Sequence, residues 1–284
     1  MTNRLFLALI LVFVLNISKG QAPFPLKDEI KQFTLSKTCI VLDDDQFSPY
    51  NAYIRKSVPE FWKITQFEFI GAADFEARRK DPSYSFIILT STNYSRDKSG
   101  SEYTYINLLQ GKNVEEIGKM PEICAVPLSS TDEDDLDYGY KLGAVLSFMQ
   151  KHASMIAEDP TLTGRRYLKY YNRFTPDVHK RRILVKSDDL SPEISSLEKI
   201  KAIYGYDIEI VSEDEIVNAI RSKTSNTLIL HKVGPPADKS TGYCYKMLIG
   251  TDDAGMYYYN QHTIDKANPN ALLPADLKRM AKTE

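Results

Sequence analysis

The sequence contains one pattern of residues twice, and this repeat limits the folds that the chain can adopt. Residues 39–49 align with residues 182–192, because each segment has an apolar run, then an acidic pair and then Ser-Pro. Further aligned pairs follow in the same order, at a spacing of about 140 residues. These pairs are 67–70 with 208–211, 86–89 with 227–230, and 103–105 with 243–245. A repeat of this length is a domain and not a solenoid module, so the sequence predicts two similar halves.

Each copy has the residue pattern of three parallel strands joined by helices. The short apolar runs 40–42 and 183–185 are typical of buried strands, and the Ser-Pro that follows each run predicts the start of a helix. The later expected elements are strands at 66–70 and 207–211, helices at 74–79 and 213–221, and third strands at 85–89 and 227–230. A strand–helix–strand order implies parallel pairing with right-handed crossovers.

The end of each copy predicts an antiparallel return. Residues 103–109 and 243–249 follow the third strands with too little chain for a crossover helix. A further strand is expected at 123–126 and at 256–261, and each copy then ends in a helix, the first opened by the capping box Ser130 to Glu133. The predicted fold class is therefore α/β. It consists of two similar subdomains, each a mixed sheet of three parallel strands plus an antiparallel return, with flanking helices.

The N-terminus has the pattern of a cleavable signal peptide. Arg4 precedes the apolar run from Leu5 to Leu15, and the small residues Ser18 and Gly20 follow it. This run is shorter than the ~20 residues that a membrane-spanning helix needs, although a signal anchor remains an alternative. The predicted division is a signal peptide at 1–20, subdomains at 21–157 and 181–284, and a linker at 158–180. We expect a soluble protein that is exported to a periplasm or secreted, without a transmembrane segment after cleavage.

Charge and cysteine content exclude several classes of protein. The net charge is −2 at pH 7, and removal of the leader with Arg4 makes it more negative. Such a chain has no overall attraction to nucleic acid or to anionic membranes. Cys39, Cys124 and Cys244 are too few and too widely spaced for a disulfide-rich scaffold. They predict three buried thiols, and one disulfide with a free thiol is the alternative.

Two acidic clusters are the best candidates for a binding site. Asp43, Asp44 and Asp45 follow the first strand of the first copy, and Asp188 and Asp189 occupy the matching place in the second. Ligand sites of α/β proteins lie at the carboxyl ends of strands, and clustered carboxylates can bind Mg²⁺ or Ca²⁺. The alternative is that these aspartates only close a strand-to-helix loop and complement the helix dipole. The sequence does not identify a cofactor or a metal.

The strand–acidic pair–helix–strand order resembles the receiver domain of two-component response regulators over ~50 residues of each copy. In that resemblance Asp44 and Asp45 match the metal-binding pair of the family. The phospho-acceptor aspartate of the family corresponds to Thr90 in the first copy and to His231 in the second. Because both positions lack a carboxylate, the resemblance does not extend to phosphoryl transfer.

The remaining patterns indicate binding more than catalysis. The acidic run 131–137 is typical of a first helical turn, and the basic and aromatic segment 165–174 is typical of packing or of a contact with a partner protein. The four histidines show no metal-ligand spacing. We expect a non-catalytic, exported binding or envelope-associated protein whose partner is another envelope or secreted protein. The alternative functions are a metal-dependent hydrolase or transferase that uses Asp43 to Asp45, and small-ligand binding between the halves.

Overall fold

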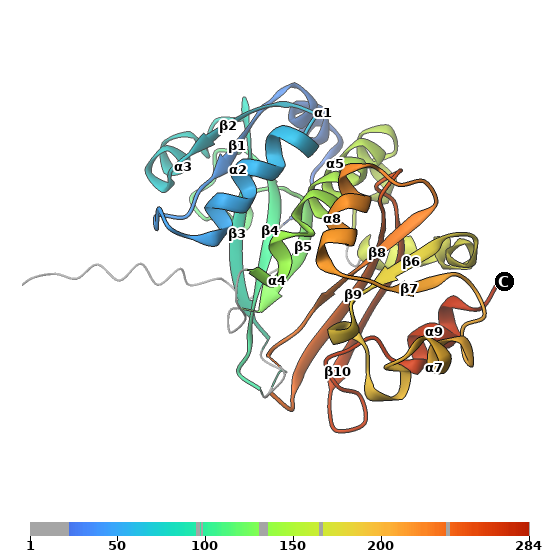
Figure 1. Cartoon of the computed structure of the whole chain (residues 1–284). Coiled ribbons are helices and arrows are strands. Elements are labelled where there is room, and N and C mark those ends of the chain that lie inside the picture. The colour runs from blue at the N-terminus through green and yellow to red at the C-terminus, as the bar shows by residue number, and fades with distance from the viewer. Residues whose placement is uncertain are drawn as a thin grey trace, which may run out of the picture.

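The computed structural model describes residues 23–94, 97, 99–130, 136–164, 167–236 and 239–283. The predicted signal peptide lies outside these residues, and so do positions 131–135 of the acidic run. The chain forms two five-stranded mixed sheets flanked by helices, which confirms the predicted α/β fold with two similar subdomains (Figure 1). Among the described residues, no helix has both the length and the apolar character needed to cross a membrane.

The first half of the molecule runs from α1 to α5. Its elements are α1 (Lys27–Leu35), β1 (Lys37–Val41), α2 (Pro49–Phe61), β2 (Gln66–Ile70), α3 (Ala72–Arg78), β3 (Tyr84–Asn93), β4 (Glu102–Gln110), η1 (Ile117–Lys119), β5 (Glu122–Ser130), α4 (Leu136–Gly139) and α5 (Leu142–Glu158). The strand order is β2-β1-β3-β4-β5, with β1 parallel to β2 and β3, and with β4 antiparallel to β3 and β5.

The second half runs from β6 to α9 and repeats this topology. Its elements are β6 (Arg182–Val185), η4 (Ser187–Asp189), η5 (Pro192–Ile194), α7 (Leu197–Lys201), β7 (Ile208–Ile210), α8 (Glu213–Arg221), β8 (Thr227–Val233), β9 (Gly242–Gly250), β10 (Met256–Ile264) and α9 (Pro274–Met280). The order β10-β9-β8-β6-β7 has the same neighbours and the same strand directions as the first sheet. The antiparallel return is therefore present in both halves.

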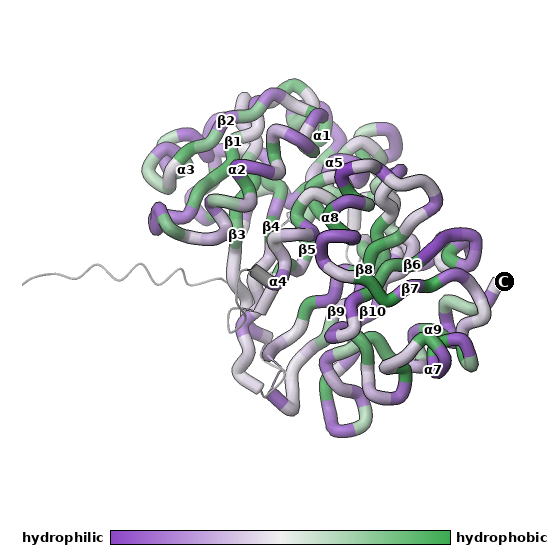
Figure 2. Tube along the Cα trace, viewed as in Figure 1, coloured by the Kyte–Doolittle hydropathy of each residue, from purple (hydrophilic) through white to green (hydrophobic). Residues whose placement is uncertain are grey.

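The two sheets do not turn equivalent faces toward each other. In the first half, Ile40 of β1 and Leu108 of β4 face the core that both halves share. The matching residues of the second half, Ile183 and Leu248, face away from that core, into a separate cluster with α7 and α9. Non-equivalent faces of the two sheets are therefore directed toward the shared core. Figure 2 shows apolar residues along the strands of both sheets.

The helix predicted after Ser-Pro forms in the first half only. Pro49 begins α2, although the Ser48 side chain makes no capping hydrogen bond. In the second half, Pro192 begins a short 3-10 turn, and the helix α7 starts later, with Ser196 as its N-cap. The prediction was wrong there because residues 190 and 272 form a β-bridge, which holds this segment against a loop from the end of the chain.

The segment between the halves is helical and packs on the second sheet. It contains η2 (Pro160–Leu162), α6 (Tyr167–Tyr170) and η3 (Tyr171–Lys180). The Asn172 side chain exchanges two hydrogen bonds with the backbone of Tyr259, at 2.8 and 2.9 Å, so η3 is fixed along β10. Tyr171 is buried beside Phe148 of α5, which joins this segment to the shared core as well.

Candidate functional site

At the carboxyl edge of the first sheet, β1 is followed by a loop that hydrogen bonds hold in place. The Asn51 side chain accepts from the N–H of Asp43 at 2.9 Å and donates to the carbonyl oxygens of Asp43 and Asp45. The Asp43 carboxylate accepts from the N–H of Asp45, and the Asp45 carboxylate accepts from the N–H of Phe47, both at 2.9 Å. Two of the predicted site residues therefore order this loop with their carboxylates.

This loop presents an apolar side chain to solvent. The Phe47 side chain is 92% exposed, and the three aspartates that precede it are exposed too. Single exposed apolar residues are common on protein surfaces. Phe47 differs from a residue in a loose loop because its own N–H and that of Ser48 both donate hydrogen bonds to Asp45. The loop therefore combines an aromatic tip with acidic side chains in a defined geometry.

The second acidic pair lies at the carboxyl edge of the second sheet and has a different environment. Asp188 is exposed, but Asp189 is buried, with 7% of its surface accessible. One Asp189 carboxylate oxygen lies 3.7 Å from Nζ of Lys232, and the other accepts no hydrogen bond from the described residues. Asp189 thus forms a buried ion pair with a residue of β8, which the sequence pattern did not predict.

The first half contributes to this second edge through the turn between α4 and α5. The ring of Tyr140 lies beside two ammonium groups, with Nζ of Lys141 at 4.8 Å and Nζ of Lys186 at 5.3 Å from its centroid. Lys186 also forms an ion pair with Glu213 at the start of α8. Burial first, and then the Asp189 and Glu213 carboxylates, raise the pKa of the Tyr140 hydroxyl further above its usual value. Both halves thus build this edge.

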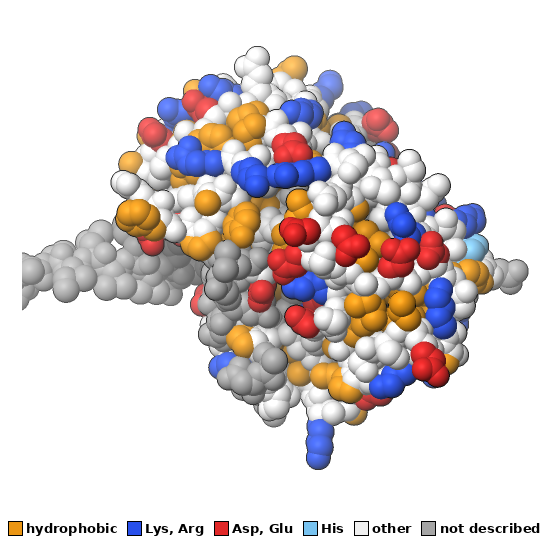
Figure 3. All heavy atoms as spheres, viewed as in Figure 1, with side chains coloured by type: hydrophobic (Ala, Val, Ile, Leu, Met, Phe, Trp, Pro, Cys, Tyr) orange, Lys and Arg blue, Asp and Glu red, His pale blue; other side chains and the backbone are white. Residues whose placement is uncertain are grey.

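The structure does not join the two predicted acidic clusters into one site. Asp43, Asp44 and Asp45 lie at the end of β1, whereas Asp188 and Asp189 lie at the end of β6 in the other sheet. In the described part of the chain, no group of three or more His, Cys, Asp or Glu side chains is arranged to hold a metal ion. Figure 3 shows acidic side chains in a band across the face near α4 and α8, below a row of Lys and Arg near α2.

A thiol and an imidazole come together in space although they are distant in sequence. Cys244 of β9 lies opposite His262 of β10, so their side chains are cross-strand neighbours. Cys244 is fully buried, and burial raises the pKa of its thiol to about 12. A protonated thiol that solvent cannot reach is not a nucleophile, so this pair belongs to the packing of the sheet. Cys39, Cys124 and Cys244 are all buried free thiols, as predicted.

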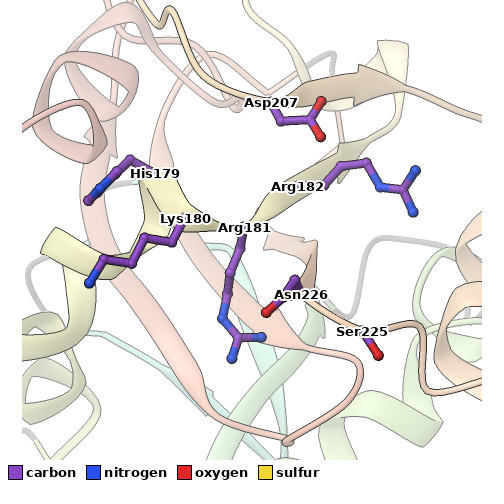
Figure 4. A pocket seen from close by; sticks show the side chains of 7 residues that line it. All are labelled: His179, Lys180, Arg181, Arg182, Asp207, Ser225 and Asn226. Atoms are coloured by element: carbon purple, nitrogen blue, oxygen red, sulfur yellow. The ribbon is translucent and has the colours of Figure 1, made fainter.

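A basic pocket of about 270 Å³ lies at the opposite, amino edge of the second sheet. Its lining includes Lys180, Arg181 and Arg182, and Figure 4 shows that the two arginine side chains point in different directions. Each of the three cations already has an acidic partner. The ion pairs are Lys180 with Asp177 at 2.6 Å, Arg181 with Asp252 at 2.8 Å and Asp253 at 3.0 Å, and Arg182 with Glu209 at 3.5 Å. The pocket therefore does not direct its positive charges toward one anion.

The basic and aromatic segment that was singled out in the sequence packs on the protein itself. The Arg173 guanidinium lies over the ring of Tyr170 at 5.1 Å, and Phe174 lies against Tyr257 of β10. Arg165 and Arg166 lie outside the described residues. The described part of this segment thus fits the interpretation as packing.

Sequence reasoning missed Phe47, Tyr140, Lys141 and Lys232. Phe47 follows the acidic cluster closely in the sequence, so an aromatic residue in this predicted loop could have been recognised as a candidate for binding. The other three gain their neighbours only when distant segments fold together. No family model matches the chain, and neither a curated protein nor a solved structure matches it.

Proposed function

We propose that the chain is an exported protein that binds another envelope or secreted protein through loop 43–47. The observation that carries this proposal is the 92% exposed ring of Phe47 on a loop held by hydrogen bonds. Aromatic anchors provide much of the binding energy of protein interfaces. A loop that is ordered before binding also loses little conformational entropy on association, which favours affinity.

The charge of the loop defines the kind of partner that it fits. Asp43, Asp44 and Asp45 are exposed and lie two to four residues before Phe47 in the chain. A complementary surface has an apolar pocket for the phenyl ring and Lys or Arg side chains at its rim, because complementary charges speed association and exclude wrong partners. We therefore propose a partner with a basic, pocketed surface.

The local hydrogen bonds favour binding over metal-dependent catalysis at this loop. A divalent cation needs several carboxylate oxygens that point to one place. Here one oxygen of Asp43 and one of Asp45 each accept a backbone hydrogen bond from the loop itself. The geometry of the loop thus depends on these two carboxylates. We propose that their role is to hold the loop in the shape that binds the partner.

Site-specific photo-cross-linking in the native host tests the proposal. A photoreactive phenylalanine analogue replaces Phe47 in one variant and Leu197 in a control, where Leu197 is 44% exposed on α7 of the second half. We expect a covalent product from position 47 and none from position 197. Reversal of charge by Asp44→Lys with Asp45→Lys is expected to reduce the yield. Equal products from both positions, or none from position 47, would contradict the proposal.

Export has its own test. Cell fractionation followed by N-terminal sequencing of the purified protein is expected to show a mature chain that lacks residues 1–20. A full-length N-terminus in the membrane fraction would instead identify a signal anchor.

A further inference from the structure

A second pocket lies between the two halves of the molecule. Its volume is about 120 Å³, and it is lined by α2, α4 and α5 of the first half and by α8 of the second. Pockets that bind small molecules occur preferentially where two domains meet. This pocket is separate from loop 43–47, because no residue of that loop lines it.

Two glycines form the floor of this pocket and bring aromatic rings close to the helix backbone. A Cβ atom added at Gly139 would lie 2.3 Å from Cε2 of Tyr53, and one added at Gly143 would lie 2.5 Å from Cε2 of Phe61. Any larger residue at these positions would push the rings outward. The glycines therefore allow the rings of Tyr53 and Phe61 to lie close to the backbone of α4 and α5.

The walls of the pocket are largely apolar. Tyr53, Phe61 and Tyr140 line it from the first half, and Val217 and Ile220 line it from α8. A dry cavity of about 150 Å³ with a similar apolar lining is large enough to bind benzene. The space between the halves is smaller, at about 120 Å³, so one six-membered ring is the largest ring system that it can take without movement of the halves.

Two cationic side chains and one carboxylate, that of Glu60, also line the pocket. Lys56 of α2 is exposed and forms no ion pair with the described residues. Arg221 of α8 lies with its Nε 3.6 Å from a carboxylate oxygen of Glu60, and its two terminal nitrogens have no hydrogen bond with the described residues. Those two nitrogens are the pair with which a guanidinium binds a carboxylate in a bidentate manner.

We propose that this pocket binds a small monocyclic aromatic carboxylate. The ring lies between the aromatic side chains of the first half and the aliphatic side chains of α8, and the carboxylate binds Arg221 and Lys56. The apolar walls select the ring, the volume limits it to one ring, and the cations select the negative charge.

Titration of the isotopically labelled mature protein with benzoate, followed by amide chemical shifts in NMR, tests this site. We expect saturable shifts at Gly139 and Gly143, which lie on the floor of the pocket. Benzyl alcohol has the ring without the charge, and benzylamine has the opposite charge, so both are expected to bind at least about tenfold more weakly. Equal binding of benzylamine, or no saturable shift with benzoate, would overturn the proposal.

Matched variants separate the pocket from nonspecific binding. Val217→Trp fills the space and is expected to abolish the benzoate shifts, whereas Asn218→Trp adds the same ring on the exposed side of α8 and is expected to retain them. Arg221→Met is expected to weaken benzoate binding about tenfold while leaving benzyl alcohol unaffected. The NMR spectrum of each variant shows whether it is folded. Retained benzoate binding in a folded Val217→Trp variant would place the ligand elsewhere and sink the proposal.

Discussion

The hydroxyl of Tyr103 accepts a hydrogen bond from the backbone N–H of Tyr243 at 2.6 Å. These two tyrosines occupy matching positions in β4 and β9, so the repeated segments contact each other directly. The contact is extended by the ring of Tyr245, which lies edge-on to Tyr103 at 5.6 Å. The repeat is therefore part of the junction between the halves as well as of each sheet.

Replacement of Tyr103 by Phe is expected to destabilise the protein by about 1–3 kcal/mol, because it removes the hydroxyl that accepts a hydrogen bond from the Tyr243 N–H. The hydroxyl also donates to Asp97 at 3.1 Å, and that bond is lost too. Chemical denaturation measures the change in free energy of unfolding. Tyr206→Phe is a suitable control, because the Tyr206 hydroxyl has no hydrogen bond with the described residues and should change stability little.

The buried pair Lys246–Asp276 predicts a second effect on stability. Both side chains are inaccessible to solvent, and Asp276 also accepts hydrogen bonds from Tyr258 at 2.6 Å and Asn260 at 2.8 Å. Lys246→Met is expected to cost about 3–5 kcal/mol, because it leaves a buried carboxylate without its cation. The double variant with Asp276→Leu should be less destabilised than the sum of the single variants. Strict additivity in denaturation experiments would argue against a coupled pair.

The same carboxylate predicts a loss of stability in acid. Burial alone would raise the pKa of Asp276, but the Lys246 ammonium and the hydrogen bonds that Asp276 accepts hold this pKa below its usual value. Its contribution to stability is therefore complete above about pH 4 and is lost as the pH falls through the lowered pKa. Unfolding free energies measured across this range should show a slope that Asp276→Asn removes.

Two buried histidines predict a separate pH window. Burial lowers the pKa of His152 to about 4 and, together with the nearby Lys141 ammonium, that of His231 to about 3. Below about pH 6.5 the unfolded chain binds protons that these folded imidazoles do not, so stability falls with falling pH until the lowered values are reached. For His152 the loss is on the order of 3 kcal/mol between pH 6.5 and 4. His152→Phe should flatten this part of the curve, and an unchanged slope would be evidence against it.

Divalent cations are expected to leave the melting temperature of the mature protein nearly unchanged, because the Asp43 and Asp45 carboxylates are used within their own loop. Calorimetry with Mg²⁺ or Ca²⁺ and after chelation measures this. A rise of several degrees in the wild type that Asp44→Ala with Asp45→Ala abolishes would instead favour the metal-dependent enzyme.

Much of the architecture could be predicted from the sequence because the strands and their order depend on local patterns. The short apolar runs 40–42 and 183–185 predicted β1 and β6, and the repeat predicted the order of the strands that follow them. The segment after Ser191 could not be predicted in the same way. Its local pattern matches that of α2, but the N–H of Ser191 donates to the carbonyl of Leu272 at 3.0 Å, and this long-range contact decides its conformation.

The candidate site was predictable only in part for the same reason. The position of both acidic pairs at strand ends followed from the repeat. The burial of Asp189 depends on Lys232, which reaches it from another strand, and the surroundings of Tyr140 depend on Lys186 from the other half. The exposure of Phe47 ran against the usual burial of aromatic residues, and the hydrogen bonds of Asn51, Asp43 and Asp45 that hold its loop are visible only in the structure.

The two halves meet through non-equivalent faces of their sheets, so the junction between them has no twofold symmetry. A contact between unlike faces is heterologous, whereas a closed twofold dimer needs a patch that meets its own copy. Copies of one half that packed on each other as the two halves do here would extend in series and would not close as a pair. Residues at matching positions of the two halves therefore have different environments. Ile106 packs in the shared core, whereas its counterpart Lys246 forms an ion pair with Asp276.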